Sequence, residues 1–218
     1  MAIAILNAHS EFPDPRGADA EGLVAVGGKM TVPRLLKAYR SGIFPWTATP
    51  VTWWSPDPRA VLEFEAFHVS RSLRRVLRQN HFRLTRDQAF LEVIKACAEP
   101  APGRGSTWIT HEFLAAYSEM HRRGYAHSLE CWQGDRLAGG IYGVALGGFF
   151  AGESMFHRVP NASKVALYHL LRHLRERGFV LFDIQVLTPI TTRLGGSDTP
   201  REEYLKRLAG ALQLDCVF

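Results

Sequence analysis

The spacing of apolar positions divides the chain into two parts. Residues 1–62 carry short apolar runs broken by Pro and Gly, and one helix is expected from Pro33 to Ser41, ended by Gly42. From residue 63 onward the apolar runs are longer and more regularly spaced. We therefore expect a small N-terminal domain over residues 1–62 and a larger domain over residues 63–218.

The larger part alternates between helical and strand periodicity. Its helices are expected to begin beside capping residues, namely Ser70, Asp87, Thr110, Asn161 or Ser163, and Pro200. Its strands are expected over residues 127–132, 136–146, 149–156 and 179–186. The Gly147-Gly148 dipeptide marks a hairpin. This order predicts an α/β (α+β) fold around a mixed sheet.

Polar residues interrupt two of these apolar strands. Glu153 lies in the strand expected over 149–156, and Asp183 and Gln185 lie in the strand expected over 179–186. Strand alternation predicts that Asp183 and Gln185 share one face, away from Phe182 and its apolar neighbours. A buried charge needs a partner, a shifted pKa or a ligand. A polar network that closes the sheet and a small active site both explain the pattern.

These polar residues favour chemistry on an amine if they form a site. A hydrogen bond between the side chains of Asp183 and Gln185 would polarise the amide, and Glu153 would hold a cationic amine. Such a group suits aminolysis of an activated ester, where orientation supplies most of the rate. Ile141, Phe150 and Met155 are near enough in sequence to line an acyl slot. On the residues alone, core packing is the better explanation of these three.

Composition excludes several protein classes. With 46% hydrophobic and 22% charged residues, the chain has the composition of an ordinary globular protein. No apolar run approaches the roughly 20 residues of a membrane helix, and the N-terminus lacks the pattern of a signal peptide. The cysteines lack metal-ligand spacing, so we expect a cytoplasmic protein without a metal. Phosphate-loop, zinc-protease and nucleophile-elbow motifs are absent from the sequence, and no cofactor is expected.

Charge is distributed unevenly. Lys and Arg total 26 against 21 Asp and Glu, and the calculated pI is about 9.3. A stretch without acidic residues concentrates arginines at positions Arg71, Arg74, Arg75, Arg78, Arg83 and Arg86. A solvated helix face is the simpler explanation. The use of Arg rather than Lys favours phosphate recognition, because guanidinium groups bind phosphate through two hydrogen bonds.

A series of short motifs resembles one bacterial family along nearly the whole chain. In order they are GLVAVGG (22–28), AYxxGIFPW (38–46), WWSPDPR (53–59), TWI (107–109), AHSxE (126–130), GGxYG (139–143), GESMF (152–156), NASK (161–164) and DxQ (183–185). Together they resemble the leucyl/phenylalanyl-tRNA–protein transferases. The resemblance implies a small N-terminal domain, a GNAT-like acyltransferase domain, and transfer of Leu or Phe from aminoacyl-tRNA. The implied acceptors are proteins with N-terminal Arg or Lys, which are marked for degradation by the N-end rule.

The resemblance also implies roles for individual residues. The implied catalytic residues are Asp183, Gln185 and Glu153. The implied aminoacyl pocket contains Ile141, Phe150, Met155 and Leu170. The implied adenosine-binding residues are Trp46 and Trp108, and the implied tRNA-binding residues are Arg71, Arg74, Arg75 and Arg78. Three residues depart from those that the family commonly has, namely Ile141, Leu170 and Arg193.

Two other functions compete with this interpretation. A GNAT-like acetyltransferase would require a pyrophosphate-binding motif between a strand and a helix, and the sequence has Val159-Pro160-Asn161-Ala162-Ser163 at the corresponding place. A non-catalytic RNA-binding module would explain the arginines and tryptophans. It would leave Glu153, Asp183 and Gln185 without a role.

Overall fold

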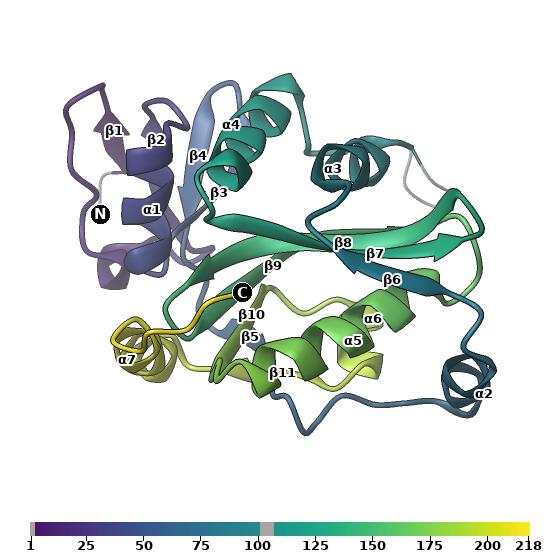
Figure 1. Cartoon of the computed structure of the whole chain (residues 1–218). Coiled ribbons are helices and arrows are strands. Elements are labelled where there is room, and N and C mark those ends of the chain that lie inside the picture. Colours follow the sequence, from purple (N-terminus) through teal and green to yellow (C-terminus); the bar gives the residue numbers. More distant parts are fainter. Residues whose placement is uncertain (1–2, 101–106) are drawn as a thin grey trace.

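A computed structural model describes residues 3–100 and 107–218 and contains two sheets (Figure 1). The smaller sheet has the order β1-β2-β4-β3. Its strands are β1 (Ala4–Leu6), β2 (Leu23–Gly27), β3 (Phe44–Ala48) and β4 (Val51–Trp54). Helix α1 (Val32–Arg40) buries its apolar face, and a 3₁₀ turn covers Pro15–Gly17. This unit is the small N-terminal domain.

The larger sheet has the order β11-β5-β10-β9-β8-β7-β6. Its strands are β5 (Arg59–Leu62), β6 (Arg83–Arg86), β7 (Ala126–Gln133), β8 (Arg136–Leu146), β9 (Phe149–His157), β10 (Leu181–Gln185) and β11 (Gly196–Thr199). Strands β9 and β10 run parallel, and the other described neighbours run antiparallel. The sheet is therefore mixed, as predicted.

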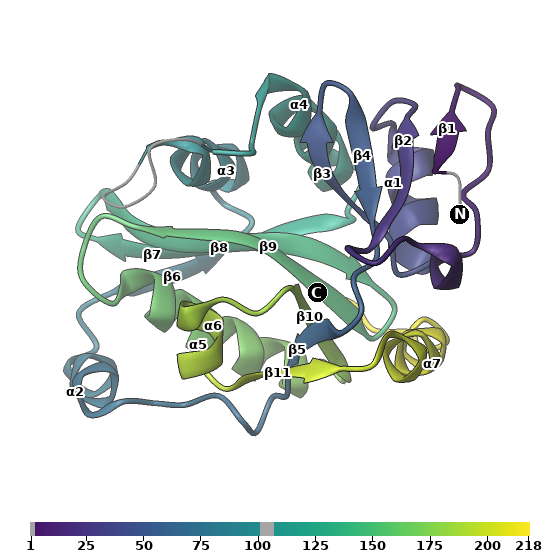
Figure 2. The same cartoon turned by 180° about the vertical axis from the view of Figure 1, so that it is seen from behind.

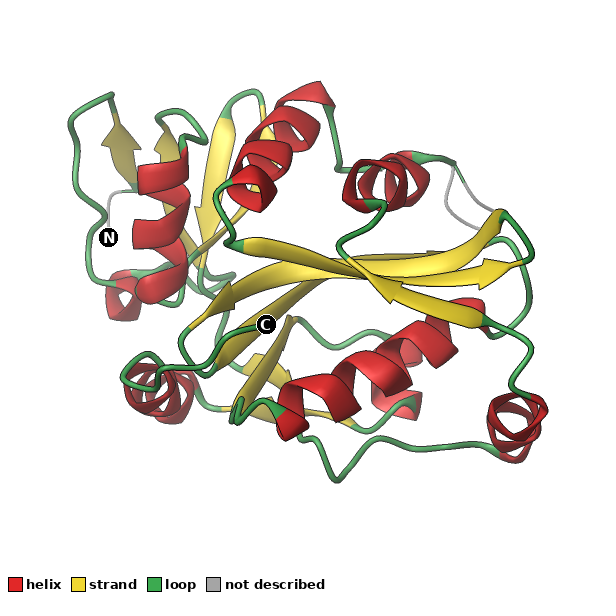
Figure 3. Ribbon diagram, viewed as in Figure 1, coloured by secondary structure: helices red, strands yellow, loops and turns green. Residues whose placement is uncertain are grey.

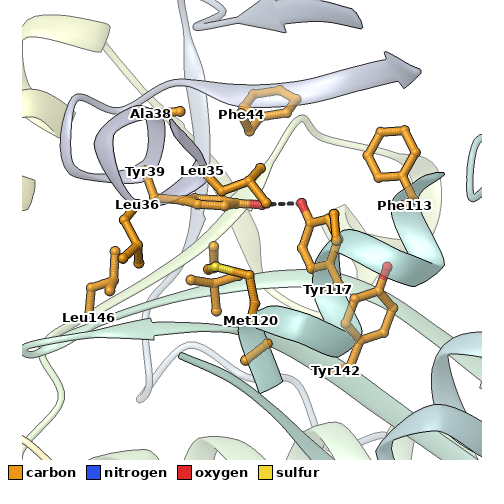
Figure 4. Packing of buried hydrophobic residues seen from close by; sticks show 14 of the residues in the cluster. Leu35, Leu36, Ala38, Tyr39, Phe44, Phe113, Tyr117, Met120, Tyr142 and Leu146 are labelled. Carbon is orange, nitrogen blue, oxygen red and sulfur yellow. Dashed lines mark hydrogen bonds between the residues drawn. The ribbon is translucent and has the colours of Figure 1, made fainter. Parts of the chain in front are cut away.

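Helices cover both faces of the larger sheet (Figures 2 and 3). On one face lie α3 (Phe90–Ala98) and α4 (His111–Arg122), and on the other lies α5 (Ala162–Glu176), next to α2 (Arg71–Gln79). Helix α6 (Pro189–Arg193) lies between β10 and β11, and helix α7 (Arg201–Ala211) follows β11. Figure 4 shows the apolar packing between α1 and α4. Among the described helices, none is long and apolar enough to cross a membrane.

The predicted mixed α/β fold with a small N-terminal domain is confirmed. Strand β5 lies within the first 62 residues but pairs with β10 and β11 of the larger sheet. The domain boundary at residue 62 stays a prediction. The expected cap at Asp87 is wrong, because α3 has Ala89 at its N-cap. Asp87 instead accepts hydrogen bonds from the Ser128 backbone N–H at 2.8 Å and from His127 Nδ1 at 2.7 Å.

Two irregularities in the strands prepare the site. Pairing of β9 with β10 extends only as far as Ala151 opposite Asp183. In β9 the register with β8 passes from Gly152 to Ser154, which leaves Glu153 as an extra residue. In β10 the register with β5 shifts between Asp183 and Gln185. Such bulges redirect side chains and are frequent beside active sites.

Candidate active site

A cavity of about 260 Å³ opens beside the strand segments that follow the last β9–β10 pair. Its wall contains residues of β3, β9, α5, β10 and α6, and Trp108 from the segment before α4. Apolar side chains dominate this wall, among them Leu62, Ile141, Met155, Leu167, Phe182, Ile184 and Leu194. Glu153 and Gln185 also line it. An apolar cavity with a few converging polar groups is the usual form of a small-ligand site.

Glu153 receives three hydrogen bonds from neutral donors. Tyr39 Oη of α1 donates to Glu153 Oε1 at 2.8 Å, and Gln185 Nε2 donates to the same oxygen at 3.0 Å. Tyr117 Oη of α4 donates to Glu153 Oε2 at 3.3 Å. The two tyrosine hydroxyls also hydrogen-bond to each other, so one of them shares its single hydrogen between Glu153 and the other hydroxyl (Figure 4). Both structural units thus hold the carboxylate, since α1 belongs to the N-terminal unit.

The environment of Glu153 raises its pKa toward neutral pH. Burial raises the pKa of the Glu153 carboxyl to about 7, and the donors Tyr39 and Gln185 offset only part of this increase. Burial also raises the pKa of Tyr39 and Tyr117 well above the ordinary tyrosine range, so both remain protonated donors. Glu153 can therefore change charge near pH 7 while its tyrosine partners stay neutral.

Asp183 is a residue of β10 itself, and its side chain is fully buried. Arg59 donates to both of its carboxylate oxygens, from Nε to Oδ1 at 2.9 Å and from Nη2 to Oδ2 at 2.7 Å. Tyr204 Oη donates to Oδ2 at 2.9 Å, and the backbone N–H of Gln185 donates to Oδ1 at 2.8 Å. The charge of Asp183 is thus compensated, and the carboxylate fixes the backbone that carries Gln185.

Arg59 is a residue of this site that sequence reasoning missed. Its side chain is 1% exposed, and its guanidinium lies 4.7 Å from the Phe44 ring centre and 4.5 Å from the Tyr204 ring centre. Its Nη1 donates to the Gly42 carbonyl oxygen at 2.9 Å. Burial acts to lower the pKa of Arg59, but the charge and hydrogen bonds of Asp183, together with Tyr204 and Glu153, raise it above its ordinary value. Its place at the start of an otherwise apolar strand was the available signal.

The predicted side-chain hydrogen bond between Asp183 and Gln185 is wrong. Gln185 has a positive φ of 66° and follows the bulge in β10, so regular strand alternation does not hold there. Its amide nitrogen donates to Glu153, while only its backbone N–H reaches Asp183. The carboxylate that orients the Gln185 amide is therefore Glu153, and the amide oxygen is the end that a ligand would meet.

The structure separates the residues expected in the apolar pocket into two pairs. Ile141 and Met155 line the cavity. Phe150 and Leu170 were expected there and do not line it, because they are buried at 0% and 1% exposure in the core. Phe150 stacks on Phe182 at 5.6 Å between ring centres, one layer behind the cavity wall. The part that α5 contributes to the wall is Leu167, one turn before Leu170.

The remaining candidates lie at the cavity and on α2. Trp46 and Trp108 both line the cavity, and Trp46 is 40% exposed. The arginines of α2 are exposed and do not line it: Arg71, Arg74, Arg75 and Arg78. Ser70 caps this helix by accepting a hydrogen bond from the Leu73 backbone N–H, as expected. Among the described residues, no group of three His, Cys, Asp or Glu is placed to hold a metal ion.

Comparison with known proteins assigns the family. The family model described as leucyl/phenylalanyl-tRNA protein transferase matches residues 61–209, and that of the N-terminal domain of these proteins matches residues 28–57. The chain belongs to the leucyl/phenylalanyl-tRNA–protein transferase family. Family membership identifies it as an aminoacyltransferase, rather than an acetyltransferase or a non-catalytic RNA-binding module.

Relatives in this family are similar over nearly their full length. The leucyl/phenylalanyl-tRNA–protein transferase of Anaeromyxobacter sp. (strain K) is 51% identical over 98% of this chain and 93% of its own. That of Nitratidesulfovibrio vulgaris (strain DP4) is 50% identical over 92% of this chain and 87% of its own. Among solved structures, L-PGS from Bacillus licheniformis matches 74% of this chain and 54% of its own, with a TM-score of 0.40 and 13% identity. That likeness is too low to establish a common fold.

Proposed function

We propose that this transferase moves Leu or Phe from aminoacyl-tRNA to the N-terminal α-amine of proteins that begin with Arg or Lys, and thereby marks them for degradation. The observation that carries this proposal is the position of Glu153 and Gln185 on the wall of an otherwise apolar cavity. An apolar acyl group and a cationic amine would meet at that place.

The cavity provides a place for each part of the acyl donor. The apolar side chain of the aminoacyl group would contact Ile141, Met155 and Leu167. Trp46 and Trp108 line the same cavity and would stack on the terminal adenosine, a contact that aromatic side chains make with any base. The ester carbonyl would then lie beside Gln185. Holding the ester and the amine together supplies much of the rate of such a reaction.

Glu153 and Gln185 would prepare the attacking amine. The ionised Glu153 carboxylate would attract the α-ammonium group of the acceptor. The α-ammonium group first releases one proton to solvent. The lone pair of the neutral amine then attacks the ester carbon, the amide bond forms, the ester bond to the tRNA ribose oxygen breaks, and the nitrogen gives up a second proton. Gln185 Oε1 would accept a hydrogen bond from the amine and orient it. A neutral amide is a weak base, so the leaving ribose oxygen, or a neighbouring ribose hydroxyl, would take the proton.

The tRNA body would bind through its backbone. The exposed arginines of α2 offer guanidinium groups for phosphate contacts, so affinity for tRNA should fall steeply with salt concentration. The aminoacyl-tRNA substrate is a cytoplasmic molecule, and we place the enzyme in the cytoplasm for that reason.

One transfer assay tests the proposed function. The protein is incubated with Phe-tRNA or Leu-tRNA and a peptide that begins with Arg, and mass spectrometry should show the peptide extended by one Phe or Leu. The same peptide with an acetylated N-terminus is the control and should remain unchanged. Absence of extension, or equal extension of the acetylated peptide, would overturn the proposal.

A further inference from the structure

A second cavity lies between β6, β7 and α5 and shares no lining residue with the candidate active site. Its volume is about 250 Å³. Arg86 of β6 and three residues of α5, His169, Arg172 and His173, contribute its polar wall, and Leu129 of β7 contributes apolar surface.

Local structure explains why these side chains converge. In β6, alternation directs Leu84 and Arg86 to the same face. In α5, Arg172 and His173 lie three and four residues after His169, which places all three on one side of the helix. The cations of a strand and a helix therefore face the same space.

His173 has a buried polar atom without a partner in the described part of the chain. Its Nε2 is inaccessible to solvent and makes no hydrogen bond, while its ring packs edge-on against Phe218 at 4.9 Å. Buried nitrogen atoms of this kind are normally satisfied by a protein group, a water molecule or a ligand. The His173 ring lines the cavity, and a ligand oxygen would reach this nitrogen once the ring turns about its side-chain bonds.

The charges around His173 favour an anion. Burial lowers the pKa of His173 first, Arg86, Arg177 and His127 lower it further, and Glu176 raises it. Burial and Arg172 lower the pKa of His169 in the same way. Glu176 also lines the cavity and pairs with Arg172 at 3.1 Å, so one carboxylate opposes the arginines. An anion would offset the repulsion that the arginines exert on both imidazoles.

We propose that this cavity binds a phosphate group, with Arg86 and Arg172 as its charged contacts and the His173 imidazole, turned toward the cavity, as a hydrogen-bond donor. Guanidinium groups suit phosphate because they offer two parallel N–H donors. A neighbouring cavity of about 480 Å³ shares His169 and Arg172 and adds Arg74 and Arg78 of α2. The phosphate would therefore come either from a free phosphate compound or from an RNA backbone that continues across α2. Only the RNA source rests on the proposed function.

The test follows the imidazole signals of His169 and His173 by NMR while inorganic phosphate is added to the whole chain at constant ionic strength. Wild-type protein should show a saturable shift of both signals, and the titration midpoint of His173 should rise when phosphate is bound. Arg86→Gln and Arg172→Gln should each weaken phosphate binding about tenfold or more, since each removes a charge-assisted contact. Arg136→Gln, at an exposed arginine of β8, is the matched control and should bind as wild type does.

Two results would overturn the phosphate site in folded variants whose thermal unfolding matches the wild type. One is the absence of a saturable shift, and the other is an equal affinity in Arg86→Gln, Arg172→Gln and Arg136→Gln. Where phosphate binds, addition of deacylated tRNA distinguishes the source. If the tRNA displaces the bound phosphate, the natural ligand is an RNA backbone. If the phosphate stays bound, the natural ligand is a free phosphate compound. The NMR shift and the displacement by tRNA do not depend on peptide extension, so a failure of the proposed transfer would be detected separately.

Discussion

The two carboxylates of the candidate site, Glu153 of β9 and Asp183 of β10, have opposite surroundings. Asp183 is fully buried and is paired with the guanidinium of Arg59 through two hydrogen bonds. Glu153 lies on the cavity wall and receives hydrogen bonds only from neutral groups, namely Tyr39, Tyr117 and Gln185. A buried ion pair has a fixed charge, whereas a carboxylate held by neutral donors can titrate near neutral pH.

This contrast suggests different roles for the two carboxylates. Asp183 shapes the site through the backbone of Gln185, and its oxygen atoms are occupied by protein donors. Glu153 keeps the charge that an amine would meet, and its pKa of about 7 makes that charge dependent on pH. We therefore propose Asp183 as a positioning residue and Glu153 as the group that would contact the acceptor directly.

The largest expected effect comes from breaking the buried pair. Arg59→Met should destabilise the fold by about 3–5 kcal/mol, because it leaves the Asp183 charge buried without its partner. Chemical denaturation measures the free energy of unfolding. Arg16→Met breaks an exposed ion pair with Glu202 and should leave the stability close to that of the wild type. Equal losses in the two variants would show that Asp183 does not depend on Arg59.

Adding Asp183→Asn to Arg59→Met should restore part of the lost stability, because the double variant has no uncompensated charge. Transfer should stay impaired in that double variant, since the amide side chain no longer fixes Gln185 as the carboxylate does. Full recovery of both stability and transfer would contradict a positioning role for the pair.

The second effect concerns Glu153 and the pH dependence of stability. Its pKa is raised from 4.5 to about 7 in the folded chain, so its stabilising contribution is complete below pH 4.5 and is lost as the pH rises through 7. The loss should total about 3 kcal/mol, from about 1.4 kcal/mol per pKa unit. Denaturation curves across this range should show this fall in wild type and not in Glu153→Gln. Parallel pH profiles of the two proteins would refute the assignment.

The smallest effect distinguishes the donors to Glu153. Tyr39→Phe removes the donor at 2.8 Å and should raise the pKa of Glu153 by about one unit, since a hydrogen bond to a charged group contributes about 1.5–3 kcal/mol. The transfer rate should then begin to rise at a correspondingly higher pH. Tyr117→Phe, whose donor lies at 3.3 Å, should shift the profile less.

Tyr142→Phe is the matched control for these two variants. The Tyr142 hydroxyl is buried and makes no hydrogen bond in the described part of the chain, although its ring packs edge-on against Tyr117 at 5.8 Å. Removal of that hydroxyl should leave the pH profile of transfer unchanged. A shift as large as that of Tyr39→Phe would mean that packing, rather than hydrogen bonding, controls Glu153.

The sequence predicted those features that depend on neighbouring residues. Long alternating runs and the Gly147-Gly148 dipeptide located the hairpin of β8 and β9. The unusual charge of Glu153 in an apolar strand predicted the position of the candidate site. Phe150 and Ile141 look alike in sequence, however, and only the packing of Phe182 between Phe150 and the cavity separates the core from the cavity wall.

The partners of the two carboxylates were beyond local reasoning. Tyr39 and Glu153 are 114 residues apart, and Arg59 and Asp183 are 124 residues apart, so their contacts arise only when the sheets assemble. The positive φ of Gln185 depends on the bulge in β10, which a regular alternation of side chains does not anticipate. Regular alternation predicts that Asp183 orients the Gln185 amide, whereas Glu153 does so in the structure.

The most direct test of the contrast is the titration of Glu153 itself. Carbon-13 NMR of the side-chain carboxyl, assigned by comparison with Glu153→Gln, reports its protonation in the folded chain. We expect a midpoint at about pH 7, raised by burial beside the neutral donors Tyr39 and Gln185. A midpoint near the ordinary value of 4.5 would contradict the division between a paired, positioning Asp183 and a titrating Glu153.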